Sequence, residues 1–183
     1  MKNLNLRTVL VQLVKHAPPL LAQNFRPDCC IAATKVAIGV LTMLGFPVKP
    51  QPTQLMVFTR KLWRRVESNT FDRPFLHGEY SVGVGYDPKT GEQGYIGHLV
   101  ALAAEPSSKN TTFLIDLSLG QAARPKNWIV LPPAIFIAGN KLNINRCVLI
   151  YKPIDNQKFL ESPDWHDRTR TDQIILELAK IIK

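Results

Sequence analysis

The sequence predicts an α+β domain, in which helices near both ends of the chain pack against an antiparallel sheet. Two observations predict this class: apolar residues recur at helical spacing towards both ends, and short strand-like runs fill the middle. Only short turn segments separate most of those runs, and short connections favour antiparallel pairing. The 183 residues, 45% of them hydrophobic, suit one domain with a substantial core rather than a disordered chain.

Two helices are expected ahead of the first strand. Apolar residues recur at helical spacing close to the N-terminus, and Pro18 and Pro19 predict the end of that first helix. A second helix is expected over residues 29–44, with Asp28 as its N-cap and Gly45 as its C-cap. Small residues on one face of this helix would let it pack closely against a sheet.

Strand-like runs follow the second helix in quick succession, with Gly, Pro, Asn and Asp turn residues between them. Residues 59–78, basic at first and irregular later, are expected to form a surface insertion between the first two runs. A final helix is expected after Thr171 or Asp172 as its N-cap. The expected strands cover residues 54–58, 79–85, 95–104, 111–117, 128–131 and 146–152.

The whole chain, residues 1–183, is expected to be a single domain. Residues 1–27 would be its N-terminal helical extension, and residues 153–183 its C-terminal loop and helix. Three cysteines, an odd number, argue against a disulfide scaffold and favour a reducing compartment. The N-terminal apolar run is too short for a signal peptide, and Lys35 interrupts the most apolar stretch. We therefore expect a soluble, cytoplasmic protein with no membrane span.

His98 and Asp116 are polar residues inside strands that are otherwise apolar. A buried carboxylate is costly unless it is paired or hydrogen-bonded. The turn at residues 105–110 would make the two strands neighbours and bring His98 and Asp116 side by side. The carboxylate would then accept from one imidazole nitrogen and orient the ring. The alternative for His98 alone is a satisfied core histidine.

Cys30 is the candidate nucleophile, because it stands at the start of the second helix. Unpaired N–H groups and the dipole at a helix N-terminus favour a thiolate, and they could also stabilise an oxyanion on an attacked carbonyl. With an imidazole oriented by a carboxylate, Cys30 would complete a Cys-His-Asp triad. The alternative for any cysteine is packing, which is the interpretation we favour for Cys29 and for Cys147. The cysteines show no metal-ligand pattern, so we expect no metal and no cofactor.

The segment from Cys30 to Pro47 resembles the nucleophile helix of transglutaminase-like cysteine enzymes. In that superfamily a cysteine opens a helix, a Leu-Gly-Phe-Pro-like stretch closes it, and a Gly-His strand and an Asp strand follow in that order; arylamine N-acetyltransferases share the core. The resemblance covers residues 28–119. It implies a papain-like, transglutaminase-type core with Cys30 as nucleophile, His98 as base and Asp116 as orienting group.

Three amides are further candidates for the site. Gln121 directly follows the Asp strand and could line the substrate cleft or cap a loop. Gln23 and Asn24 precede Cys30 by seven and six residues, where papain-like enzymes place an oxyanion amide. We list these three as candidate substrate-binding or oxyanion residues.

A basic run accounts for part of the net charge of +9, and it contains Arg60, Lys61, Arg64 and Arg65. Such a run could bind nucleic acid or an acidic partner, or it could be the solvated face of a helix. The leading hypothesis is a cysteine-dependent acyl-transfer enzyme acting on an amide of a peptide or protein, as a peptidase, amidase, deamidase or transglutaminase-like enzyme. The alternatives are an acyltransferase that uses a coenzyme A thioester and a non-catalytic basic binding module.

Overall fold

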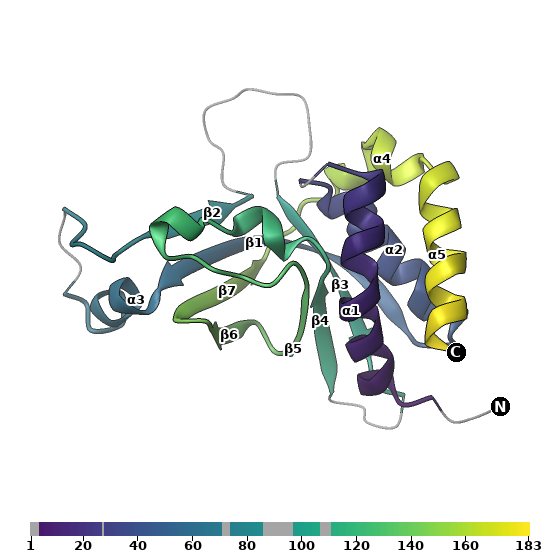
Figure 1. Ribbon diagram of the computed structural model, residues 1–183, viewed down its shortest axis with the longest axis horizontal. Helices are drawn as coiled ribbons and strands as arrows, with labels where there is room; N and C mark the ends of the chain where they lie inside the picture. Colours follow the sequence, from purple (N-terminus) through teal and green to yellow (C-terminus); the bar gives the residue numbers. More distant parts are fainter. Residues whose placement is uncertain (1–3, 27, 71–73, 86–96, 107–110) are drawn as a thin grey trace.

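Helices pack against an antiparallel sheet in the computed structural model of the chain, which describes residues 4–26, 28–70, 74–85, 97–106 and 111–183 (Figure 1). The predicted α+β class is confirmed. The helices are α1 Leu6–Asn24, α2 Cys30–Met43, α3 Arg60–Glu67, α4 Pro163–His166 and α5 Thr169–Ile182, with 3-10 helices η1 Leu119–Ala122, η2 Pro125–Asn127 and η3 Lys158–Glu161. The strands are β1 Val48–Thr59, β2 Ser81–Val84, β3 His98–Ala104, β4 Thr112–Asp116, β5 Ile135–Ala138, β6 Lys141–Ile144 and β7 Cys147–Pro153.

The long strand β1 organises the sheet. In the described part of the chain the strand order is β5-β4-β3-β1-β7-β6, and every pairing is antiparallel. Strand β3 pairs with residues 48–53 of β1, and β2 pairs with residues 55–58. Strand β7 pairs with residues 53–59, which places it on the other edge of β1 from both of them. Strands β2 and β3 therefore follow one another along a single edge.

Two apolar cores lie on the two faces of this sheet. Helices α1, α2 and α5 pack on one face against Ala101, Ala103 and Ile115, whose small or branched side chains let the helices approach the strands closely. The opposite face buries Val100 and Leu114 together with residues of β1, β5 and β7. Successive side chains of a strand point to opposite faces. The two cores therefore hold β3 and β4 from both sides, which fixes where the polar residues of these strands point.

Helix α2 begins one residue later and ends one residue earlier than predicted, with Leu44 as its C-cap and Gly45, the predicted C-cap, as the residue after it. Gly45 has a φ of 84°, and the N–H of Phe46 donates to the carbonyl of Leu41 at 2.9 Å, as in a Schellman motif. Cys29 is the N-cap, and no side chain caps the helix. The prediction of Asp28 as the N-cap is therefore wrong. The consequence is that Cys30 is the first helical residue and the free N–H groups of the first turn surround it.

Proline misled the prediction at two other elements. Helix α1 continues through Pro18 and Pro19 to Asn24, because Ala17 and Leu21 are buried against the core on either side of the pair. Strand β1 likewise begins at Val48 and includes Pro50 and Pro52, which were expected to lie in a connection. These two prolines lie where β1 pairs with β3 alone, before β7 joins its other edge at Thr53. A proline is tolerated at such an edge, since its missing N–H has no partner to serve.

Other boundaries also differ from the sequence prediction. Residues 128–131 form no strand; Ile129 makes only an isolated bridge to Arg124, and Trp128 has a left-handed φ of 63°. The strands β5 and β6 were not predicted. Residues 95 and 96 of the expected third strand, 71–73 of the expected insertion and 107–110 of the expected turn lie outside the described residues. Among the helices that are described, none has the length and hydropathy needed to cross a membrane.

Candidate active site

His98 and Asp116 form a buried pair on neighbouring strands. His98 is the first residue of β3 and Asp116 the last of β4, and the register that sets Ala101 opposite Ile115 places the pair on one face of the sheet, diagonally across the ladder. The Nε2 of His98 lies 2.7 Å from Oδ2 of Asp116, and neither side chain is exposed. The structure thus brings together two residues that lie 18 positions apart in the sequence.

Two residues that the sequence analysis did not select complete the surroundings of Asp116. The Tyr151 hydroxyl, on β7, donates to Oδ2 at 2.8 Å. The backbone N–H of Ser118 donates to Oδ1 at 2.9 Å, and the Ser118 hydroxyl lies 3.2 Å from the same atom. The ring of Tyr151 also stacks on His98, with a centroid separation of 6.2 Å. A tyrosine inside an apolar strand needs a partner for its hydroxyl. This requirement is the sequence feature that could have marked Tyr151 as a partner of a buried polar residue.

The pair is electrostatically coupled. Burial opposes the charged imidazolium, but the Asp116 carboxylate, its hydrogen bond and the Cys30 thiol together raise the pKa of His98 to about 10. Burial likewise opposes the charged carboxylate, yet His98 and the hydrogen bonds from Ser118 and Tyr151 lower the pKa of Asp116. Burial and the neighbouring carboxylate raise the pKa of Tyr151, so its hydroxyl keeps the proton that it donates. Asp116 is therefore held as the anion and His98 as the cation at neutral pH.

Cys30 stands at the start of α2, within hydrogen-bonding reach of His98. Its side chain is largely buried, with 8% of the residue exposed. Leu99 and Phe159 pack around it, and the Trp165 ring meets Phe159 edge to face at 4.9 Å. The C-terminal segment that contains η3 and α4 therefore covers one side of Cys30.

Hydrogen bonds to the backbone fix β3 relative to its neighbours at the site. The Thr34 hydroxyl, one turn after Cys30 on α2, donates to the carbonyl oxygen of Leu99 at 2.8 Å. The Thr53 hydroxyl, on β1, donates to the carbonyl oxygen of His98 at 2.9 Å. Both threonines are buried. Thr34 thus fixes α2, which carries Cys30, to Leu99 of β3, and Thr53 fixes the central strand β1 to His98.

A glycine at the end of β2 permits the close approach of the His98 backbone. Gly85 has a φ of 80°, and a Cβ built on it would lie 2.8 Å from the Cα of Gly97 and from the nitrogen of His98. Real Cβ atoms do not come this close to a backbone. The absence of a side chain at Gly85 therefore lets β2 and β3 meet end to end on β1.

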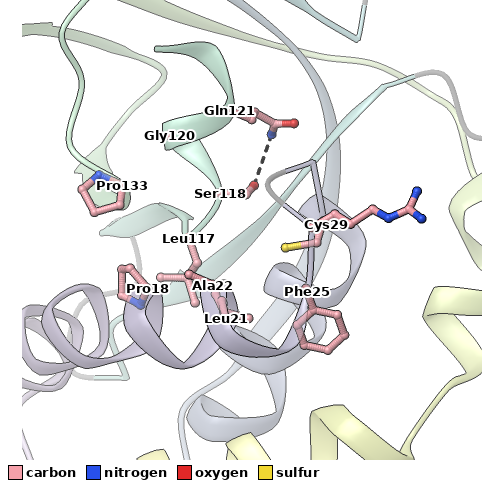
Figure 2. Close-up of a pocket in the computed structure, with 11 residues that line it drawn as sticks. Pro18, Leu21, Ala22, Phe25, Cys29, Leu117, Ser118, Gly120, Gln121 and Pro133 are labelled. Carbon is pink, nitrogen blue, oxygen red and sulfur yellow. Dashed lines mark hydrogen bonds between the residues drawn. The ribbon is translucent and has the colours of Figure 1, made fainter.

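Cys29 occupies a different environment from Cys30. It is half-buried, and burial together with the adjacent Cys30 raises the pKa of its thiol to about 11. Its sulfur points towards the cavity drawn in Figure 2, and the adjacent residue Cys30, not Cys29, interacts with His98. Cys147 is a buried core residue on β7.

Gln121 joins the buried pair to a cavity. Its Nε2 lies 3.0 Å from Nδ1 of His98 and donates to the Ser118 hydroxyl at 3.3 Å, while the residue also lines the cavity (Figure 2). A neutral ring can accept from this amide at Nδ1. A doubly protonated ring cannot, and the amide must then turn its Oε1 towards Nδ1 to accept instead. Gln121 can thus hydrogen-bond to the His98 ring whether that ring is neutral or protonated.

Gln23 and Asn24 lie apart from this network. Both are exposed at the end of α1, and the Asn24 amide donates to the carbonyl of Leu20 in its own helix at 2.8 Å. They line a second, larger cavity next to Cys29. Of these three amides, the structure therefore brings Gln121 into contact with His98 and leaves Gln23 and Asn24 at the end of α1.

The basic run lies on α3, which projects from the far end of the sheet in Figure 1. Arg60 and Arg64 are exposed, whereas Arg65 forms an ion pair of 2.5 Å with the buried carboxylate of Glu79. Lys61 donates to the carbonyl of His77 at 2.6 Å. Two members of the run therefore hold the segment of residues 74–79 against α3.

The described residues contain no group of three or more His, Cys, Asp and Glu side chains arranged to hold a metal ion. Comparison of the chain with protein families, with curated protein sequences and with solved structures finds no match.

Proposed function

We propose that the protein is a cysteine-dependent acyl-transfer enzyme with a papain-like, transglutaminase-type core, acting on an amide of a peptide or protein. The observation that carries this proposal is that the buried His98 has both partners at once. Its Nε2 lies 2.7 Å from Asp116, and Cys30, the first residue of α2, hydrogen-bonds to the same imidazole. These contacts support Cys30 as nucleophile, His98 as base and Asp116 as orienting group.

The reaction begins with His98 as imidazolium facing a Cys30 thiolate. The thiolate attacks the amide carbonyl carbon, a C–S bond forms, and the carbonyl oxygen takes the displaced electron pair. His98 gives its Nδ1 proton to the amide nitrogen, the C–N bond breaks, and the amine leaves. Water or a second amine then attacks the thioester and gives a proton to His98, and the C–S bond breaks to restore the starting pair.

The helix end supplies stabilisation for the charge on oxygen. The backbone N–H groups of the first turn of α2 have no acceptors inside the helix, and no side chain caps them. A carbonyl under attack by Cys30 lies beside these donors. Loss of a single oxyanion donor in other hydrolases costs roughly a hundredfold in rate or more, which is the scale we expect here.

The test is the covalent intermediate. Wild-type protein is incubated with activated peptide, glutamine-amide and thioester probes, and the mass of each cysteine-containing peptide is measured. We expect an acyl adduct on Cys30 that Cys30→Ala abolishes and Cys29→Ala retains. An adduct on Cys29 alone, or unchanged acylation in Cys30→Ala, would refute the assignment. Preferential acylation by the coenzyme A thioester, with protection against unfolding by coenzyme A, would support the acetyltransferase-like alternative.

A binding function is the second candidate, because a basic and aromatic face lies away from the triad. Trp128 is 48% exposed and meets His77 edge to face at 5.0 Å, and His77 is held by Lys61 of α3. Arg60 and Arg64 are exposed on the same helix as Lys61. We expect salt-dependent binding of an acidic partner that survives Cys30→Ala and is lost in Arg60→Glu/Arg64→Glu; binding unaffected by that double variant would contradict it.

A further inference from the structure

A cavity of about 210 Å³ opens between the end of α1 and the segment that follows β4 (Figure 2). Its α1 wall is formed by Pro18, Leu21, Ala22 and Phe25, and Pro133 closes the other side. The wall is thus mainly apolar. Cavities that hold whole drug-sized ligands measure roughly 300–1,000 Å³. This cavity is smaller and has the size of a single side chain.

The rim of this cavity is part of the triad network. Ser118 and Gln121 line it, and they are the residues whose polar groups bind Asp116 and His98. Cys29 lines it as well, immediately before Cys30. Cys30 and His98 do not themselves line the cavity, but a group bound there touches Cys29, the residue before Cys30, and Gln121, whose amide contacts His98.

A second cavity, of about 570 Å³, begins on the other side of the segment between α1 and α2. Its lining is polar and charged, and it includes Asn24, Asp28, Asp164 and Arg170. Both cavities share residues of that segment, among them Cys29. An apolar site and a polar site therefore meet at Cys29, the residue before Cys30.

We infer that the apolar cavity is a specificity pocket for one apolar side chain of a peptide substrate, next to the amide that Cys30 attacks, while the polar part of the peptide continues into the second cavity. This inference rests on the proposed function and names its substrate class: a peptide with a leucine-sized apolar residue beside the scissile amide. The apolar wall and the small volume favour one apolar side chain of the peptide. The residues shared by the two cavities would then place the neighbouring amide near Cys30 and His98. A basic side chain in this cavity would lose hydration and would lie near the like charge of Arg26, which also lines it.

Protection of Cys30 against iodoacetamide measures occupation of the pocket without requiring turnover. N-acetyl-leucinamide and N-acetyl-serinamide are added to the full chain at increasing concentration, and alkylation of Cys30 and Cys29 is followed by mass spectrometry. We expect half-maximal protection by the leucine amide at a concentration about tenfold lower than by the serine amide, because only the former buries an apolar side chain. Equal protection by both amides, or protection by neither, would overturn the inference.

Ala22→Trp gives the structural control, because Ala22 is exposed and lines the pocket. The larger side chain fills the pocket, so protection by N-acetyl-leucinamide should weaken about tenfold, and Ala22→Leu should fall between the two. Val11→Trp, at an exposed position of the same helix outside the pocket, should behave as wild type. The alkylation rate of Cys30 without amide should be unchanged in Val11→Trp. Unchanged protection in Ala22→Trp contradicts the pocket, whereas absence of an acyl adduct on Cys30 with intact protection contradicts only the proposed catalysis.

Discussion

The Thr34 hydroxyl donates to the carbonyl oxygen of Leu99 at 2.8 Å, and this bond joins helix α2, which carries Cys30, to strand β3, which carries His98. Thr34 lies one turn after Cys30, and Leu99 follows His98 directly. Helix α2 and strand β3 are thus fixed to each other close to Cys30 and His98. The relative position of Cys30 and His98 is set by this contact rather than by the side chains of the pair alone.

Thr34→Val is expected to loosen that contact. The variant keeps the shape of the side chain but leaves the buried carbonyl of Leu99 without its donor, which should cost about 1–3 kcal/mol in the free energy of unfolding. Alkylation of Cys30 should also slow, since His98 is no longer held in register. Thr34→Ser retains the hydroxyl and should restore most of the alkylation rate. A Thr34→Val protein that is destabilised but alkylated at the wild-type rate would contradict the positioning role.

Gly85→Ala should displace His98. The added Cβ would come within 2.8 Å of the backbone at Gly97 and His98, in addition to the strain of a left-handed φ. Gly139→Ala is the matched control, because Gly139 has a similar φ of 90° but nothing within 4 Å of the added atom. We expect both variants to lose stability and only Gly85→Ala to lose reactivity at Cys30. Equal reactivity of the two variants would show that the close approach does not position His98.

Tyr151→Phe removes one of the donors to Asp116 without opening a large cavity. The loss of a buried hydrogen bond to a charged group should cost about 1.5–3 kcal/mol. The hydrogen bond from Tyr151 contributes to the lowered pKa of Asp116, so this pKa should rise in the variant. A carboxyl with a depressed pKa stabilises the fold above its unfolded pKa and loses that contribution as the pH falls. Acid unfolding should therefore begin at a higher pH in Tyr151→Phe, as followed by circular dichroism; an unchanged acid midpoint would contradict this.

The raised pKa of His98 predicts a stability that falls with increasing pH. A histidine with a pKa of about 10 in the folded state, against 6.5 ordinarily, contributes fully below pH 6.5 and loses the contribution as the pH rises through 10. In Cys30→Ala no thiol ionises against the imidazolium, so the free energy of unfolding of this variant, measured by urea titration, should fall by about 1.4 kcal/mol per pH unit between pH 7 and 8.5. Wild-type protein, in which a thiolate offsets the imidazolium, should show a much smaller slope. In Cys30→Ala/His98→Gln the slope should disappear; the same slope in that double variant would assign it to another group.

The sequence predicted the site best where a local feature, such as a helix start or a polar residue inside an apolar strand, came together with a short connection between neighbouring elements. Cys30 follows a break and opens a long apolar helix, while His98 and Asp116 interrupt apolar strands joined by a short connection, so their pairing followed from the antiparallel hairpin. Tyr151 could not be found in this way, because its bond to Asp116 depends on the pairing of β7 with β1, which joins segments almost a hundred residues apart. The prolines of α1 and β1 were misjudged because burial and edge position decided their tolerance, and both depend on tertiary packing.

The central claim is that His98, held protonated by Asp116, keeps Cys30 reactive at neutral pH. The most direct measurement is the rate of iodoacetamide alkylation of Cys30, resolved from Cys29 by mass spectrometry, between pH 5.5 and 8. We predict a rate at pH 6 close to that at pH 8 in wild-type protein, because the imidazolium persists through this range, and a strong loss of the pH 6 rate in His98→Gln and Asp116→Asn. A wild-type rate that rises about tenfold per pH unit through this range, as for an isolated thiol, would contradict the account.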